Sequence, residues 1–137
     1  MDTGPLKAIL DRKEPSHHVC VDALKELSGP LLTTWPVFTE AMHLLRPAGG
    51  WRAQEKLWAM HQRNVLTVVD LPGSAVERAR NLMAKYSDVP MSLADATLVS
   101  LAEIRNIRRI FTLDSDFTVY RFRGRSSFKL IPSISPR

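Results

Sequence analysis

One carboxylate stands in a segment where a helix should bury apolar surface. Asp95 lies within residues 93–102, a helical pattern that follows Pro90 and Ser92 and holds almost only apolar or small side chains. The side chains that share its helical stripe are Met91, Leu98, Val99 and Ala102. An ionised carboxylate in such a place needs a basic partner, a hydrogen-bonded cap, a raised pKa or a metal ion.

A structural interpretation competes with a chemical one at Asp95. Ser92 and Asp95 have the spacing of a capping box, in which the acid reaches back to the N–H group of the serine. This pattern alone leaves both interpretations open. Further acids in comparable settings favour the ligand role.

Two of these acids are Glu40 and Asp114. Glu40 lies between Val37 and Leu44 in a helical pattern that follows a short strand candidate, so we expect its carboxylate along an apolar face. Asp114 follows directly after the apolar residues 109–113. Both acids therefore stand near the end of a predicted strand.

Helical patterns and short apolar segments follow one another along the chain. The strand candidates, which lack polar alternation, are residues 31–33, 65–69, 109–113 and 128–131. The helical patterns cover about 6–10, 16–27, 36–45, 51–61, 74–86 and 93–102, with a break at 47–50. Val19 is expected on the buried stripe of the second helix, and Ser74 with Glu77 predicts a capping box. This order predicts an α/β domain with a mainly parallel sheet covered on both faces.

The predicted sheet would bring the acids together. In open parallel sheets, ligands bind beyond the carboxyl ends of the strands, where Glu40, Asp95 and Asp114 are placed. Asp2 joins them if a strand precedes it. A group of carboxylates without histidine or cysteine is a hard oxygen site, which selects Mg²⁺ or Mn²⁺ over zinc. Without a cation, these like charges would repel one another.

Four acidic motifs, in order, also carry a resemblance to a known family. The motifs are Asp2-Thr3, TWPVFTEA at 34–41, PMSLADA at 90–96 and FTLDSDF at 111–117. In order and spacing, over nearly the whole chain, they resemble the acidic motifs of PIN-domain nucleases. The branch that they resemble most is the toxin ribonucleases of VapC-type toxin–antitoxin pairs.

The resemblance implies an α/β/α sandwich that cleaves RNA with Mg²⁺ or Mn²⁺, forms a homodimer and is neutralised by a small cognate antitoxin protein. By position, it assigns metal binding and catalysis to Asp2, Glu40, Asp95 and Asp114, with Asp116 as a further metal acid and Thr112 as a polar neighbour on the substrate side. The mechanism that follows is metal-assisted phosphodiester hydrolysis, which requires no side-chain nucleophile.

The first acidic motif departs from the family pattern, because only Met1 precedes Asp2. Either further residues precede Met1 and complete a strand, or the first strand is nearly absent and Asp2 is loosely held, since chain termini fray. We expect an N-terminal extension of several apolar residues to raise thermal stability and metal affinity.

The last quarter of the chain is basic. From Arg105 to Arg137, eight basic side chains stand against two acidic ones, a local net charge of +6, while the whole chain carries +5. Arg121, Arg123 and Arg125, with aromatic residues interleaved, suit the phosphates and bases of a single strand. A hairpin strand with Tyr120 and Phe122 inward and the arginines solvated fits this segment equally well.

The basic segment supports a rival from another functional class, a PIN-like module that binds RNA or a protein without cutting it. That module would bind RNA in a salt-dependent way and without a divalent metal. A nuclease that acts on DNA is a third interpretation.

Composition bounds the remaining possibilities. A chain of 137 residues with 45% hydrophobic residues predicts a single domain over 1–137. One cysteine, Cys20, excludes an internal disulfide and suggests a packed thiol, and the four histidines lack the spacing of a zinc site. With no long apolar run and no secretory pattern at the start, we expect a cytoplasmic protein.

Overall fold

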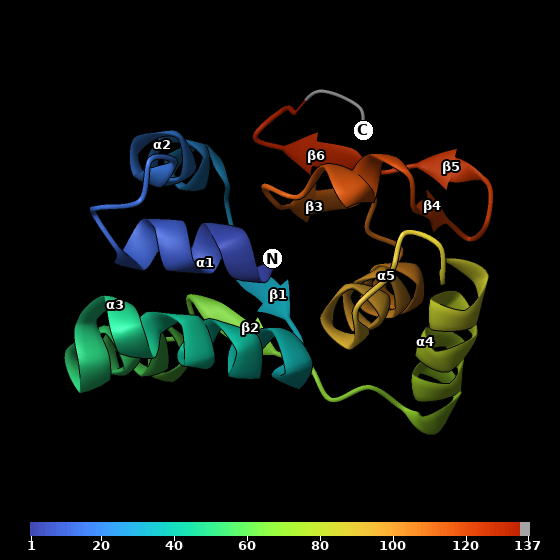
Figure 1. Cartoon of the computed structure of the whole chain (residues 1–137), viewed down its shortest axis with the longest axis horizontal. Helices are drawn as coiled ribbons and strands as arrows, with labels where there is room; N and C mark the ends of the chain where they lie inside the picture. Colours follow the sequence, from blue (N-terminus) through green and yellow to red (C-terminus); the bar gives the residue numbers. More distant parts are fainter. Residues whose placement is uncertain (135–137) are drawn as a thin grey trace.

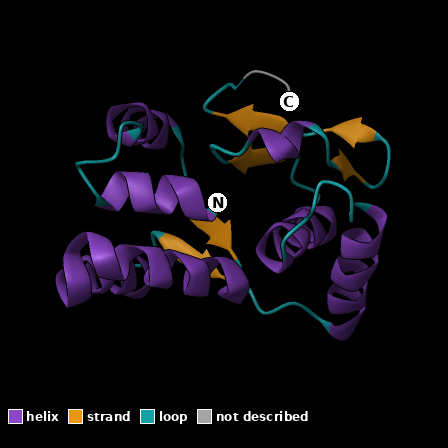
Figure 2. Cartoon of the chain, in the orientation of Figure 1, coloured by secondary structure: helices purple, strands orange, loops and turns teal. Residues whose placement is uncertain are grey.

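The central sheet is built from two pairs of strands on either side of the N-terminus. The computed structural model describes residues 1–134. In it, β1 (Leu31–Thr33) pairs in parallel with β2 (Leu66–Val68), and β3 (Arg109–Phe111) pairs in parallel with β6 (Lys129–Ile131). Figures 1 and 2 show these two pairs apart, with the N-terminus between them. The predicted parallel strands are confirmed.

Met1 and Asp2 connect the two pairs of strands. The Met1 α-amine donates to the Leu32 carbonyl oxygen at 2.6 Å, and the Asp2 N–H donates to the Phe111 carbonyl oxygen at 2.8 Å. The Thr33 hydroxyl also donates to the Met1 carbonyl oxygen at 2.8 Å. These bonds give the spatial order β2, β1, Met1–Asp2, β3, β6. Asp2 is only 6% exposed and is therefore not a loosely held terminus.

Residues 1–134 form five α-helices that pack around the strands and on one another: α1 (Thr3–Leu10), α2 (His17–Glu26), α3 (Trp35–Gln62), α4 (Gly73–Lys85) and α5 (Leu93–Arg105). Helix α1 packs on α2 and α3, while α5 packs on α3 and α4 (Figure 1). The 3₁₀ helix η1 (Ser115–Thr118) follows β3, and β4 (Arg121–Phe122) forms an antiparallel hairpin with β5 (Ser126–Ser127). This architecture is the predicted α/β/α sandwich. Within residues 1–134, no helix has the length and apolar character needed to cross a membrane.

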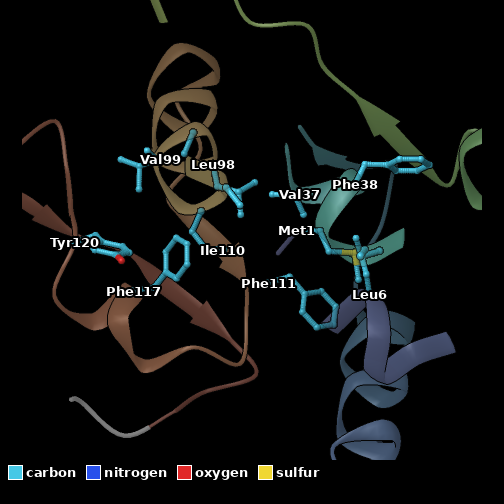
Figure 3. Close-up of a cluster of buried hydrophobic side chains, with 14 of the residues drawn as sticks. Met1, Leu6, Val37, Phe38, Leu98, Val99, Ile110, Phe111, Phe117 and Tyr120 are labelled. Atoms are coloured by element: carbon cyan, nitrogen blue, oxygen red, sulfur yellow. The ribbon is translucent and has the colours of Figure 1, made fainter. Parts of the chain in front are cut away.

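The hydrophobic core forms around α5. Leu98 and Val99 are almost fully buried, and Figure 3 shows them on the helix beside Ile110 and Phe117. Met91 and Ala102, the other members of the predicted stripe, are buried as well. All residues from Ala94 to Ala102 are buried, so this part of α5 is enclosed on every side and carries Asp95 into the interior.

Two predictions of local structure were wrong. Helix α4 begins before Ser74, because the N–H groups of Ala75 and Val76 already donate to the Pro72 carbonyl oxygen. Ser74 therefore lies in the first turn, and the predicted capping box does not form there. On α2, Val19 is 47% exposed because the neighbouring Cys20, which is fully buried, occupies the inward position.

The predicted break at 47–50 is narrower than expected. Pro47 stays within α3, and among the residues of this helix only Gly50 leaves helical geometry, with φ 61° and ψ −150°. This conformation is open to glycine because it lacks a Cβ atom. The residues after the kink form the helix predicted over 51–61, and this helix is amphipathic, with Leu57 fully buried and Trp51 61% exposed.

A cavity of about 240 Å³ lies beside Met1, between β1 and β3. Its lining is mostly apolar and includes Leu31, Leu32, Ile110 and Phe111 from the facing strands. Met1 is buried, and burial lowers the pKa of its α-amine to about 6. The cavity thus combines apolar walls from two strands with a buried amine at the chain end that connects them.

We expect an apolar extension, such as Val-Ile-Val placed before Met1, to raise the melting temperature by several degrees. It replaces the buried amine by a peptide bond and adds side chains that each contribute about 1.5–3 kcal/mol on burial, against about 1–2 kcal/mol for ordering each backbone residue. It should also strengthen metal binding, because Asp2 directly follows this segment. Calorimetry with a Gly-Ser-Gly extension as control tests this; equal melting temperatures for the two extensions would contradict it.

Candidate metal centre

Three aspartates from two separate segments converge on one point. Asp95, Asp114 and Asp116 each offer a carboxylate oxygen, and these oxygens lie within 4.8 Å of one another. Asp95 lies in the first turn of α5, Asp114 precedes η1 at the end of β3, and Asp116 lies within η1. The convergence of Asp95 and Asp114 follows from the strand-end placement expected from the sequence.

Local hydrogen bonds hold the segment with Asp114 and Asp116. Asp114 Oδ1 accepts the Asp116 N–H at 2.8 Å and so caps η1. This turn brings the two acids to the same side, although they are only two residues apart. The sequence resemblance gave Asp116 an accessory role, whereas the geometry places it in the group on equal terms with Asp114.

One half of the predicted capping box forms at Asp95. Ser92 Oγ accepts the Asp95 N–H at 3.0 Å, which is the serine half of the predicted cap. The Asp95 carboxylate accepts a hydrogen bond at Oδ2 from the Tyr120 hydroxyl at 2.9 Å. The cap therefore starts the helix, while the carboxylate stays directed at the acidic group.

Thr112 links Asp2 to Asp114. Its hydroxyl donates to Asp2 Oδ2 at 2.7 Å and accepts the Asp114 N–H at 3.0 Å. Asp2 Oδ1 accepts the Thr3 N–H at 2.8 Å, so both oxygens of this carboxylate are held. Thr112 is fully buried, and the contacts of its hydroxyl are with these acidic residues.

Glu40 lies at the rim of the site rather than on a buried face. The buried stripe of α3 runs through Val37, Phe38, Ala41 and Leu45, which leaves Glu40 beside it and exposed. The prediction of an apolar setting for Glu40 was therefore wrong. Partial burial, and then the charges of Asp2 and Asp114, raise the pKa of the Glu40 carboxyl.

Burial and mutual repulsion raise the pKa values of the central acids. The pKa of Asp95 rises to about 7, first through burial and then through the charges of Asp2 and Asp114, against the opposing hydrogen bonds from Tyr120 and Ser92. The pKa of Asp2 is raised mainly by burial. Ionised carboxylates are thus unfavourable here, and a bound cation would reverse that cost.

The donor set fits a hard divalent cation. The clustered ligand atoms are all carboxylate oxygens, the type that Mg²⁺ and Mn²⁺ prefer. Thr3 Oγ1, next to Asp2 in the chain, is also buried without a hydrogen-bond partner within residues 1–134. The site therefore offers one more polar oxygen than its internal hydrogen bonds use.

The predicted substrate arginines lie on the hairpin that follows η1. Arg121 Nη1 donates to the Thr118 carbonyl oxygen at 2.8 Å and also approaches the next two carbonyl oxygens. Arg123 donates from Nη2 to the Glu103 carbonyl oxygen at 3.0 Å, and Arg125 is exposed. The hairpin and the buried Tyr120 and Phe122 confirm the inward aromatic side chains, whereas Arg121 and Arg123 bind carbonyl oxygens and are not simply solvated.

Tyr120 is the residue of the site that sequence reasoning missed. Its pattern indicated an inward aromatic side chain, and it is indeed fully buried. Its hydroxyl partner, Asp95, lies 25 residues earlier in the chain, on another element. Since periodicity reports only which face is buried, the pattern held no signal for this bond.

A family model described as the PIN domain matches residues 1–123. The chain belongs to the PIN domain family. This PIN chain is 27% identical over 133 residues to ribonuclease VapC26 of Mycobacterium tuberculosis, which covers 96% of this chain and 98% of that protein. Its fold matches the crystal structure of VapC20 from Mycobacterium tuberculosis, a toxin that cleaves the sarcin–ricin loop. The TM-score is 0.80 at 20% identity, over 86% of this chain and 91% of the other. The predicted resemblance to VapC-type PIN proteins is confirmed.

Proposed function

We propose that this chain is a metal-dependent endoribonuclease and the toxin of a type II toxin–antitoxin pair. The observation that carries the proposal is the convergence of Asp95, Asp114 and Asp116 within 4.8 Å, in a protein of the PIN family. RNA as substrate follows from the ribonuclease VapC26, which matches nearly the whole chain.

Asp95, Asp114 and Asp116 would hold the divalent cation, with Asp2 supporting the site from the buried side and Glu40 from the exposed rim. When bound, Mg²⁺ or Mn²⁺ supplies Lewis-acid stabilisation of the negative charge that develops at the scissile phosphate. Glu40, exposed and with a raised pKa, is the carboxylate that we assign to accept a proton from the attacking water. Thr112 acts by holding Asp2 and Asp114 in place, since its hydroxyl is fully engaged with them.

Cleavage of labelled RNA and of a DNA with the same sequence, in Mg²⁺ or Mn²⁺ and with EDTA as control, tests this function. We expect metal-dependent cuts in RNA that EDTA abolishes. RNA that is bound but uncut would favour the binding module, and cuts confined to DNA would favour the third interpretation. Cleavage that continues in EDTA would contradict a metal-dependent reaction.

We further propose that Arg121, Arg123 and Arg125 contact substrate phosphates. Replacing all three by Ala should weaken RNA binding and lower the log–log salt slope by about 2, since each single-strand phosphate contact contributes roughly 0.7. The matched control is the triple Ala variant of Arg46, Arg52 and Lys56, which removes the same charge from exposed positions of α3.

The triple variant also removes the hydrogen bond from Arg121 to the Thr118 carbonyl oxygen at the end of η1, so a second variant that keeps this bond is needed. Arg125→Ala removes an exposed guanidinium without touching η1, so it reports phosphate contact alone. Filter binding at several salt concentrations gives the slopes. An unchanged salt slope in the hairpin triple variant would show that these arginines do not contact substrate phosphates.

The proposed partners follow from the same family assignment. We propose a homodimer in the cytoplasm that a small cognate antitoxin neutralises. The exposed aromatic surface of α3 around Trp51 and Trp58, which are 61% and 36% exposed, is available for one of these contacts. Analytical ultracentrifugation of the wild type and of Trp51→Ala would show whether this surface forms the dimer.

A further inference from the structure

A fully buried tyrosine donates its hydroxyl to the central acid of the site. Tyr120 Oη lies 2.9 Å from Asp95 Oδ2, and its residue is fully buried. The bond crosses between two elements, from the segment after η1 to the first turn of α5. Tyr120 thereby links the segment that carries Asp114 and Asp116 to the helix that carries Asp95.

The ring of Tyr120 is held from two sides. It packs edge-on against Phe117, with ring centroids 5.0 Å apart, and against Tyr86 at 5.1 Å. Figure 3 shows the Phe117 and Tyr120 rings side by side. Close packing of this kind fixes the ring, and so the hydroxyl has little freedom to leave Asp95.

We propose that Tyr120 is a positioning residue of the metal centre, which acts by fixing the Asp95 carboxylate. This inference rests on the proposed metal-dependent function. Because Oδ2 accepts the phenol, rotation of the Asp95 carboxylate is restrained, with one of its oxygens within 4.8 Å of the carboxylate oxygens of Asp114 and Asp116. A ligand that is oriented before the cation arrives has less freedom to lose on binding, so the hydrogen bond should strengthen metal affinity.

The chain offers a matched control for removal of the phenol. Tyr86 packs on the Tyr120 ring, and its hydroxyl accepts the Arg121 N–H at 3.1 Å rather than bonding to an acid of the site. Tyr120→Phe and Tyr86→Phe therefore each lose one internal hydrogen bond at the same aromatic contact. Only the first variant frees the Asp95 carboxylate.

Mn²⁺ titration calorimetry of the two variants and the wild type tests the proposal. We expect Tyr120→Phe to weaken Mn²⁺ binding by roughly 10–100-fold, the effect typical of losing a partner that orients a metal ligand. Tyr86→Phe should leave the affinity nearly unchanged. RNA cleavage by Tyr120→Phe should recover when the metal concentration is raised, because the ligand itself is retained.

A second measurement separates positioning from a purely structural role. At equal melting temperatures, Tyr120→Phe should still bind Mn²⁺ more weakly than Tyr86→Phe, because only the Tyr120 phenol acts through the Asp95 carboxylate. A Tyr120→Phe protein that binds Mn²⁺ as tightly as the wild type, whatever its melting temperature, would overturn the proposal. Wild-type protein that binds no Mn²⁺ would instead defeat the metal centre itself.

Discussion

Asp95→Asn should abolish RNA cleavage while leaving the protein folded. The amide keeps the size of the side chain and can still accept the Tyr120 hydrogen bond, but it removes the charge that a divalent cation requires. We expect the rate of RNA cleavage to fall by more than about 100-fold. Loss of a residue that only hydrogen-bonds to a metal ligand typically costs roughly 10–100-fold. Cleavage assays at saturating Mg²⁺, with circular dichroism for the fold, measure both results.

The matched control for this variant is Asp88→Asn, which makes the same substitution at an exposed aspartate. It should keep wild-type activity. Full activity in Asp95→Asn, or an equal loss in both variants, would contradict the assignment of Asp95.

The second large effect concerns stability and pH. The folded-state pKa of Asp95 is raised from 3.8 to about 7, so between these values the folded protein binds more protons than the unfolded chain. The free energy of unfolding of the metal-free protein should therefore fall as the pH rises from about 4 to 7. At about 1.4 kcal/mol for each pH unit, the contribution of Asp95 is about 4 kcal/mol.

Denaturant unfolding of the wild type and Asp95→Asn across this pH range measures the difference. The lowered pKa of the Met1 amine makes the free energy of unfolding rise with pH between about 6 and 8. Both proteins share this contribution, so it cancels in the comparison. Asp95→Asn should be the more stable of the two metal-free proteins at pH 8, and its unfolding free energy should fall less from pH 4 to 7. If the unfolding free energies of the two proteins changed in parallel with pH, the pKa of Asp95 would not be raised in the folded state.

Mg²⁺ should reverse this loss of stability at a pH at which the acids of the site are ionised. A ligand at 100 times its Kd stabilises the folded state by about 2.7 kcal/mol. We expect this gain for the wild type at pH 8, little gain at pH 5, and none in Asp95→Asn. Equal stabilisation of both proteins would place the cation elsewhere.

The sequence was sufficient to predict the site acids that lie at the end of a strand or at the start of a helix. Asp95 stood out because its stripe is otherwise apolar, and Asp114 because it directly follows an apolar strand. Both predictions use local periods and the general position of sites in parallel sheets, and the structure brings these two acids together. Placing Asp116 on equal terms required the turn of η1 that Asp114 caps.

Contacts between distant segments could not be predicted in the same way. Glu40 was misplaced because the spacing of Val37 and Leu44 fits two possible stripes, and only packing against α1 and the sheet selects the one through Leu45. The sequence left open whether Asp2 is loosely held, and the structure shows it fixed by Thr112, which lies 110 residues away. Tyr120 was predicted only as a core residue, because its hydrogen-bond partner, Asp95, lies on another element.

The central claim is that these acids form one divalent cation site in a ribonuclease of the PIN family. Anomalous diffraction from crystals soaked in Mn²⁺ locates such a cation directly. We predict a single strong peak, or a close pair, among the carboxylates of Asp95, Asp114 and Asp116, and its loss in Asp95→Asn. A peak elsewhere, or no peak at a Mn²⁺ concentration that supports RNA cleavage, would contradict this account.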